Sequence, residues 1–467
     1  MSSPPSHHTH SRLLLDISPT DSLSPYTRPP LPRRLAATTP AGRVPPTTPS
    51  QDKHDDPSTF PGPIVLPDDC LALEPTYPPQ SLRSWLLSKD RNPVTTTRKT
   101  LYVVAPPDIS GPPAMTAALK SWSGTAPTPA HAKRHASSSG NRHPSIESIR
   151  EYLSAFYHGL DVKLLDEALR WVSWEEGDFE KKRIPKYIGL ATANGQCTGV
   201  RCRQPNDPGL GLHHQLNLSD ILDVLIELVP GDAYAVLMLV HHDLYEDDED
   251  DFCAGRAFGG SRVAVVSTFR YNPAMDGLRD EVDYEHIWPS SHCLDYLEPR
   301  HPQSIISKKS KRTARHSFKS SVIVDLNSPG GIPAAVQAAI SIAGTNPSKP
   351  DTDGLWLARV CKTASHELGH CFALDHCVYY SCIMQGTASL EEDDRQPPYL
   401  CPICLTKLTC AMQRTKPGID KPAEKEYVLR RYEALEVFCS KRPGVPMLAD
   451  FGVWLRVRME SLREEEA

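Results

Sequence analysis

The sequence predicts an α/β (α+β) fold in which helices pack against a mixed β-sheet. The first observation is the apolar run AYAVLMLV at residues 233–240, which is bounded by turn residues and is typical of a central strand covered on both faces. The second is that such runs alternate along the chain with segments of helical periodicity. This alternation indicates a layered domain built from strands and helices.

Local patterns predict each element in turn. Ile149 and Leu153 recur at helical spacing with other apolar residues, which predicts a helix at 145–160. Asn217 or Ser219 is a candidate N-cap for a second helix, whose apolar residues mostly face a core. The predicted strands are 99–107, 186–192, 233–240 and 258–271, and the predicted helices are 145–160, 216–230, 333–344, 355–374 and 423–441.

Composition suggests fewer domains than 467 residues would ordinarily form. Proline numbers 45 and is concentrated in the first third, where no period persists. We therefore predict a disordered N-terminal region at 1–95, a folded domain at 96–445 and a C-terminal tail at 446–467. Within the folded domain, periodicity is lost at 272–330, which we interpret as an insertion loop.

Charge and cysteine content exclude several classes of protein. A net charge of -6 gives no general reason to expect nucleic acid as a partner, and no apolar stretch is long enough to span a membrane. Thirteen cysteines without a secretory signal favour bound metal in a reducing compartment over disulfides. We expect a cytoplasmic or nuclear protein. The basic run at 307–321 has the composition of a nuclear localisation signal, but we favour the interpretation that it is an exposed insertion loop.

Three histidines and a glutamate form the first candidate metal site. His366 and His370 stand four residues apart within a predicted helix, so both imidazoles lie on one face and can bind one zinc ion. His376 can approach the same ion from another side if the helix ends near Ala373 and the chain turns. Because three histidines leave one coordination position for water, Glu367 is placed to activate that water. This is the arrangement of a metal-assisted hydrolase.

These residues resemble the metzincin signature HExxHxxGxxH, with Met384 standing where that family has a methionine-containing turn. The resemblance implies a catalytic helix below a twisted mixed sheet and a substrate extended along an edge strand. Residues 257–268 are the candidate edge. Ala373 departs from the signature, because it replaces the glycine of the turn. If that position requires a positive φ, alanine costs about 1 kcal/mol, so other contacts must hold the turn or the turn takes another shape.

Four cysteines form the second candidate metal site. Cys377 and Cys382 precede Cys401 and Cys404, which close the segment as CPIC. Two such pairs can surround one zinc ion tetrahedrally, and a closed site of four thiolates leaves no position for water. A redox role for CPIC is the weaker alternative, since such a motif would have no use for the first pair. The spacing therefore predicts a structural zinc site.

The combined order of histidines, cysteines and Met384 resembles the archaemetzincins, a family of metallopeptidases. The specific motif covers about forty residues, and a fainter resemblance extends over 96–440. It implies two zinc ions (Zn2+), one catalytic on the three histidines and one structural on the four cysteines. Residues 96–445 would then be a catalytic domain of zincin type.

The sequence thus predicts a zinc metallopeptidase that hydrolyses peptide bonds in peptide or protein substrates, with Glu367 as the base. The alternative is a noncatalytic zinc-stabilised interaction protein, against which Glu367 argues, because a structural site needs no base. A zinc ribbon that binds nucleic acid is disfavoured by the acidic segment at 389–395, between the cysteine pairs. We expect a monomer.

Overall fold

The chain forms two compact units in the computed structural model. One unit comprises residues 89–282 and 351–373, and the other comprises 1–88, 283–350 and 374–467. The structure describes residues 10–44, 56–123, 143–179, 185–206, 214–278, 282–302, 318–345, 351–414 and 421–464. We call the two units the sheet unit and the helical unit.

The sheet unit contains a five-stranded mixed sheet with strand order β11-β12-β9-β2-β4. All neighbouring strands are parallel except β11, the edge strand, which runs antiparallel to β12. Every residue of β9 is buried, as predicted for a strand covered on both faces. The strands are β2 (Thr100–Val104), β4 (Asp161–Leu164), β9 (Ala233–Val240), β11 (Gly255–Phe258) and β12 (Val263–Ser267).

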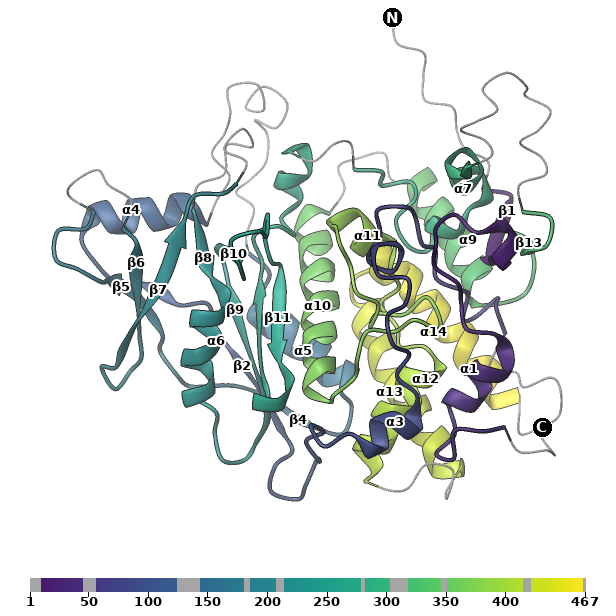
Figure 1. Cartoon of the computed structure of the whole chain (residues 1–467), viewed down its shortest axis with the longest axis horizontal. Helices are drawn as coiled ribbons and strands as arrows, with labels where there is room; N and C mark the ends of the chain where they lie inside the picture. The colour runs from purple at the N-terminus through teal and green to yellow at the C-terminus, as the bar shows by residue number, and fades with distance from the viewer. Residues whose placement is uncertain are drawn as a thin grey trace, which may run out of the picture. The chain divides into compact units, whose positions relative to one another are not determined.

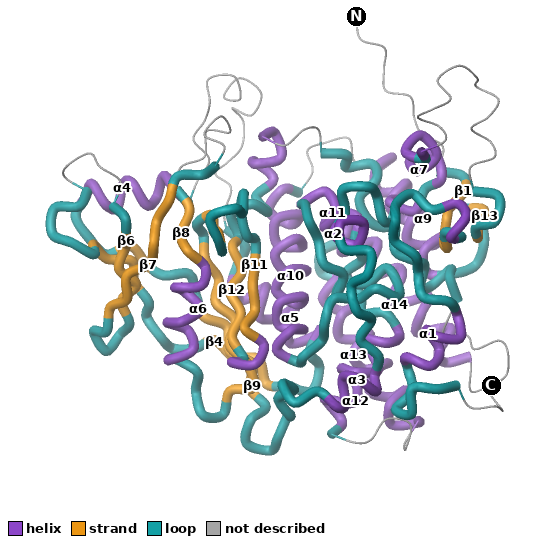
Figure 2. Tube along the Cα trace, in the orientation of Figure 1, coloured by secondary structure: helices purple, strands orange, loops and turns teal. Residues whose placement is uncertain are grey.

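Helices cover both faces of this sheet (Figures 1 and 2). On one face lies α6 (Leu218–Glu227), which is capped by the side chain of Asn217, one of the two predicted candidates. On the other lie α5 (Ile146–Phe156) and α10 (Thr352–Cys371), which contact each other. The helix α10 also contacts β11 and β12, so its residues lie beside the sheet edge.

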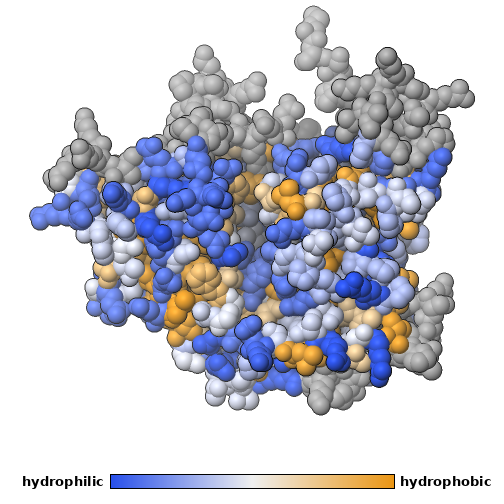
Figure 3. Space-filling view, in the orientation of Figure 1, coloured by the Kyte–Doolittle hydropathy of each residue, from blue (hydrophilic) through white to orange (hydrophobic). Residues whose placement is uncertain are grey.

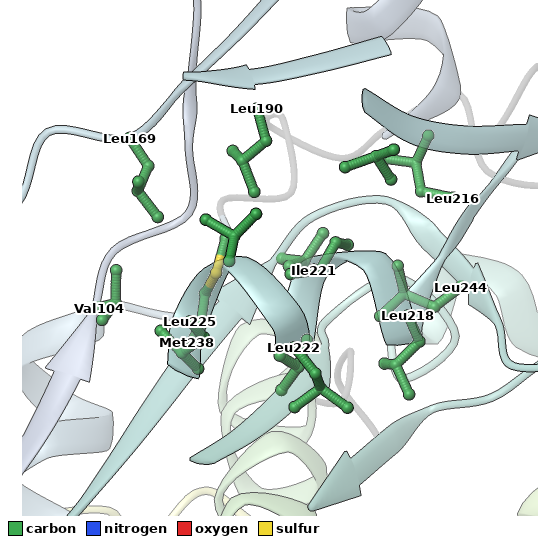
Figure 4. Close-up of a cluster of buried hydrophobic side chains, with 14 of the residues drawn as sticks. Val104, Leu169, Leu190, Leu216, Leu218, Ile221, Leu222, Leu225, Met238 and Leu244 are labelled. Atoms are coloured by element: carbon green, nitrogen blue, oxygen red, sulfur yellow. The ribbon is translucent and has the colours of Figure 1, made fainter. Parts of the chain in front are cut away.

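A second sheet shares a hydrophobic core with the first. Its strand order is β10-β8-β7-β6-β5-β3. Leu190 and Leu216 from this sheet, Ile221 and Leu225 from α6, and Met238 from β9 belong to one buried cluster (Figure 4). Each such side chain contributes roughly 2 kcal/mol by leaving water. The elements are β3 (Asp108–Ile109), α4 (Pro113–Trp122), β5 (Arg170–Ser173), β6 (Tyr187–Ala191), β7 (Cys197–Arg203), β8 (Gln215–Asn217) and β10 (Asp243–Tyr245).

The helical unit is organised around its C-terminal helices. The predicted tail at 446–467 was wrong, because α14 (Pro446–Glu464) packs against α9 (Gly331–Thr345) and α13 (Lys421–Ser440). Trp454 on α14 is fully buried and stacks on Tyr399 with ring centroids 4.3 Å apart. Further elements are α11 (Leu390–Arg395), α12 (Pro402–Gln413) and the two-stranded sheet of β1 (Arg12–Asp16) with β13 (Val322–Asp325).

The described part of the N-terminal region is ordered, in contrast to our prediction of disorder for 1–95. Leu14 in β1 and Trp85 in α3 (Leu82–Leu87) are fully buried. These segments gain their stability from distant parts of the chain; for example, the Trp454 indole donates to the Thr59 carbonyl at 3.1 Å. The other short elements are η1 (Pro19–Asp21), α1 (Leu31–Ala37) and α2 (Cys70–Leu73).

The predicted insertion loop at 272–330 also contains regular structure where it is described. It forms η5 (Pro273–Leu278), η6 (Ser290–His292), α7 (Leu294–Leu297), η7 (Glu298–Arg300) and β13. Most of the basic run at 307–321 lies outside the described residues, so its interpretation as a localisation signal stays a prediction.

Some large hydrophobic residues are exposed on the described surface, among them Leu73 and Val437. On the face shown in Figure 3, hydrophobic groups lie among hydrophilic residues. Among the described helices, none is both long and apolar enough to cross a membrane.

Candidate metal and catalytic site

The helix α10 carries two of the predicted zinc ligands on one face. It begins where the Asp351 side chain accepts a hydrogen bond from the Gly354 N–H at 2.9 Å. The Nε2 atoms of His366 and His370 lie 3.1 Å apart. Two nitrogen ligands of a tetrahedral zinc ion, each about 2.0–2.1 Å from the metal, would be about 3.4 Å apart. The spacing of these two imidazoles therefore fits a shared zinc ion.

Glu367 is buried beside the edge strand β11. Its side chain is so close to Gly255 that a Cβ at that glycine would lie 3.0 Å from Glu367 Cγ and 3.2 Å from its Oε1. Burial raises the pKa of Glu367 to about 8, with Arg256 opposing the shift and Glu246 adding to it. A positive metal ion near the carboxyl group would lower this pKa again. The Glu367 carboxyl group is thus shielded from bulk solvent and lies against the edge strand.

Glycines allow the β11 end of the sheet to approach α10 closely. Gly255 lies against Glu367, as described above. Gly259 is so near the helix that a Cβ there would be 2.4 Å from the His370 carbonyl oxygen. Such a contact is impossible for any side chain without movement of the backbone. The sequence shows a glycine pair at 259–260, but only the structure reveals that Gly259 sets the distance between strand and helix.

The turn after α10 places Ala373 in a backbone conformation that is unusual for a residue other than glycine. Its φ is 56°, in the left-handed region, where a residue with a side chain is strained by about 1–2 kcal/mol. The contacts that hold this turn involve the preceding Phe372, which is fully buried. The Phe372 ring stacks on Tyr157 at 5.1 Å and packs against Tyr234 at 4.4 Å, while the Tyr234 hydroxyl donates to the Cys371 carbonyl at 3.3 Å.

His376 lies outside regular secondary structure, five residues beyond the last residue of α10. Its N–H donates to Asp375 Oδ1 at 2.9 Å, and its ring lies 5.7 Å from that of Tyr77. His366, His370 and His376 are one of two residue groups that could hold a metal ion among the described residues.

The other group consists of the four predicted cysteines, all buried, with sulfur atoms within 4.8 Å of one another. The Sγ atoms of Cys377 and Cys401 are 3.6 Å apart. Tetrahedral thiolates about 2.3 Å from zinc would be about 3.8 Å apart, so the cluster is close to the required size. Burial raises the pKa values of Cys382 and Cys401, and a bound cation would favour their thiolate forms. The four residues fit a structural zinc ion.

Backbone hydrogen bonds shape the segment that carries the cysteines. Cys382 Sγ accepts from the N–H groups of Met384 and Cys401 at 3.4 and 3.3 Å. The Met384 carbonyl accepts from the Cys377 N–H at 2.7 Å, which closes the turn around the buried methionine. Cys404 lies in the first turn of α12, which follows the N-cap Cys401.

Comparison with known proteins finds a peptidase family at this segment of the chain. The family model of peptidase family M54 matches residues 334–410, which include α10 and all four cysteines. Archaemetzincin-2 from Pongo abelii is 32% identical over 268 residues, 57% of this chain and 54% of that protein. The archaemetzincin resemblance is confirmed. Archaemetzincin-1 from Mus musculus is 28% identical over 265 residues, 57% of this chain and 39% of that protein.

The archaemetzincin match does not extend over whole proteins. The chain spans about half the length of the first curated archaemetzincins that it matches. Among solved structures, archaemetzincin from Methanopyrus kandleri aligns at 19% identity and covers 68% of this chain and 96% of that one. The TM-score of 0.29 is too low to carry a structural argument.

Proposed function

We propose that this chain is a zinc metallopeptidase with one catalytic and one structural zinc ion. The observation that carries the proposal is the 3.1 Å separation of the His366 and His370 Nε2 atoms on the same helix as the buried Glu367. A purely structural site would require no buried carboxyl group next to a ligand. We assign His376 as the third ligand of the catalytic ion.

A bound zinc ion would polarise the scissile carbonyl and lower the pKa of a coordinated water molecule. Glu367 would accept a proton from the attacking water and deliver it to the leaving amine. His366, His370 and His376 serve only to hold the ion, and as neutral imidazoles they leave its positive charge undiminished.

The substrate is a peptide or protein segment in extended form, bound along β11. This strand is the edge of the five-stranded sheet, and Gly255 within it lies against Glu367. Backbone pairing with an edge strand would place a peptide bond near that carboxyl group. Proline substitutions along 256–258 should then raise KM, because proline removes a backbone donor. Unchanged KM across that series would contradict this binding mode.

The second zinc ion is assigned to Cys377, Cys382, Cys401 and Cys404. Because Cys377 directly follows His376, the thiolate site holds the backbone from which the third histidine projects. A closed site of four thiolates has no position for substrate or water, so its role is to stabilise the fold.

A peptide-library cleavage assay with zinc removed and restored tests the proposal. The wild-type chain should contain two zinc ions, lose cleavage on chelation and regain it with zinc. His370→Ala should lose one ion and all cleavage, whereas the control His158→Ala should keep both. Library cleavage by His370→Ala at the wild-type rate would contradict the proposal.

A further inference from the structure

His376 lacks support from regular secondary structure. Residues 374–378 form neither helix nor strand, and the turn that precedes them contains the strained Ala373. A metal ligand in such a segment can point in a fixed direction only if other contacts hold the backbone and the ring. The described contacts come largely from residues 70–88, which we call the N-terminal strap.

Tyr77 of the N-terminal strap contacts both the backbone and the ring of the histidine. Its hydroxyl donates to Asp375 Oδ1 at 2.5 Å, and the same oxygen accepts the His376 N–H at 2.9 Å. The Tyr77 ring also faces the His376 ring at 5.7 Å, with an angle of 39° between the planes. One side chain thus fixes the carboxylate that orients the backbone and limits the rotation of the imidazole.

Gln80 adds a second link from the N-terminal strap. Its Oε1 accepts the Asp375 N–H at 3.2 Å and one bond from Lys407 Nζ at 2.7 Å. The Gln80 carbonyl also accepts from Lys407 Nζ at 2.7 Å. Lys407 is buried on α12, the helix that carries Cys404. Gln80 therefore joins the backbone beside His376 to the segment that forms the thiolate site.

The imidazole is confined on another side by Gly386. A Cβ at that glycine would lie 2.8 Å from His376 Nδ1 and 3.0 Å from Cys70 Sγ. The ring thus rests directly against the backbone after the Met384 turn, with the start of the N-terminal strap beside it. Since both the strap and Gly386 restrict the ring, loss of one strap contact should loosen it without unfolding the segment.

We infer that the N-terminal strap positions His376 for zinc, with Tyr77 and Gln80 as positioning residues. The inference rests on the proposed role of His376 as third ligand. None of the strap residues lies in 334–410, where the family model matches. The contribution of the strap is to lower the cost of ordering His376 before the metal binds, so it acts on zinc affinity more than on the chemical step.

The test is the zinc affinity of the histidine site in the full chain, measured by competition with a chelator while the thiolate site stays loaded. Tyr77→Phe keeps the ring and removes the bond to Asp375, and Gln80→Leu removes the second link. We expect each to weaken zinc binding roughly tenfold or more. Cleavage at saturating zinc should remain close to wild type. Tyr187→Phe, an exposed tyrosine in β6, serves as the matched control.

A double-mutant cycle separates positioning from general destabilisation. Asp375→Asn and Tyr77→Phe should be non-additive in zinc affinity, because both break the same link, while thermal unfolding of the zinc-free Tyr77→Phe changes little. Affinities of Tyr77→Phe and Gln80→Leu within twofold of wild type would overturn the role of the strap. If His370→Ala also bound as much zinc as wild type, the proposed function itself would be wrong; loss of zinc in His370→Ala confines the failure to the strap.

Discussion

Removing the Cys382 side chain should destabilise the fold and also reduce cleavage at the histidine site. Cys382 is fully buried, and its sulfur accepts the N–H groups of Met384 and Cys401. Cys382→Ala leaves these two donors without that acceptor, which should lower the free energy of unfolding by about 1–2 kcal/mol even without metal. The zinc contribution comes in addition, since every tenfold loss of affinity removes about 1.4 kcal/mol at a fixed zinc concentration.

The effect on cleavage follows from the chain connection. Cys377 is another proposed ligand of the same ion and directly follows His376, and its N–H bond to the Met384 carbonyl belongs to the turn that Cys382 supports. Loosening this turn should displace the third histidine. We therefore expect Cys382→Ala to lose one zinc ion outright and to lower kcat/KM by roughly tenfold or more, as outer-shell changes at metal sites do.

Zinc content by atomic absorption, thermal unfolding with and without chelator, and peptide cleavage measure these effects. Cys439→Ala is the matched control, because this thiol is also buried in the helical unit but lies on α13, outside the cluster. It should cost about 1 kcal/mol and keep both ions. The reasoning is refuted if Cys382→Ala keeps two zinc ions and loses no more stability than Cys439→Ala.

Two further predictions concern strain and pH. Ala373→Gly should stabilise the protein by about 1 kcal/mol in chemical denaturation, because φ is 56° there, whereas Ala358→Gly within α10 should destabilise it by a similar amount; equal effects would refute the strain. Burial raises the pKa of Asp450 from 3.8 to about 8, so the stabilisation from its protonated form is complete below pH 3.8 and is lost as pH rises through 8. Asp450→Asn should therefore match wild type near pH 4 and exceed its stability above pH 8, on the order of 5 kcal/mol at 1.36 kcal/mol per pH unit. Asp223→Asn, at an exposed position on α6, should show no such trend in unfolding experiments, and a parallel pH dependence in all three proteins would contradict the assignment.

The sequence predicted the parts of the site that depend on local geometry. The four-residue spacing of His366 and His370 requires only an α-helix to place both rings on one face, and the structure has them 3.1 Å apart. The cysteine cluster was predictable for a similar reason, because CPIC brings Cys401 and Cys404 into one turn. The apolar run that became β9 likewise required no knowledge of distant partners.

Other parts depend on contacts that the sequence does not encode locally. The contact of Phe372 with Tyr157 and Tyr234 joins residues more than a hundred positions apart, so the support of the Ala373 turn was not predictable. The same applies to the N-terminal elements, which are too short to show a period and are ordered by bonds such as that of Trp454 to the Thr59 carbonyl.

The wrong prediction of a C-terminal tail, where the structure has α14, has a different cause. Leu448, Phe451 and Leu455 recur at helical spacing and are all fully buried. This period was present in the sequence, and attention to it would have predicted a packed helix at the C-terminal end.

The cleavage rate of a zinc-loaded Glu367→Gln variant tests the central claim most directly. Glutamine has nearly the same shape as glutamate but cannot accept a proton, so zinc content and thermal unfolding should remain close to wild type. The account predicts that this variant keeps two zinc ions and loses peptide cleavage by a factor of at least about a hundred. Cleavage at the wild-type rate, or no cleavage by either protein with both ions bound, would contradict the peptidase and favour a noncatalytic zinc-stabilised interaction protein.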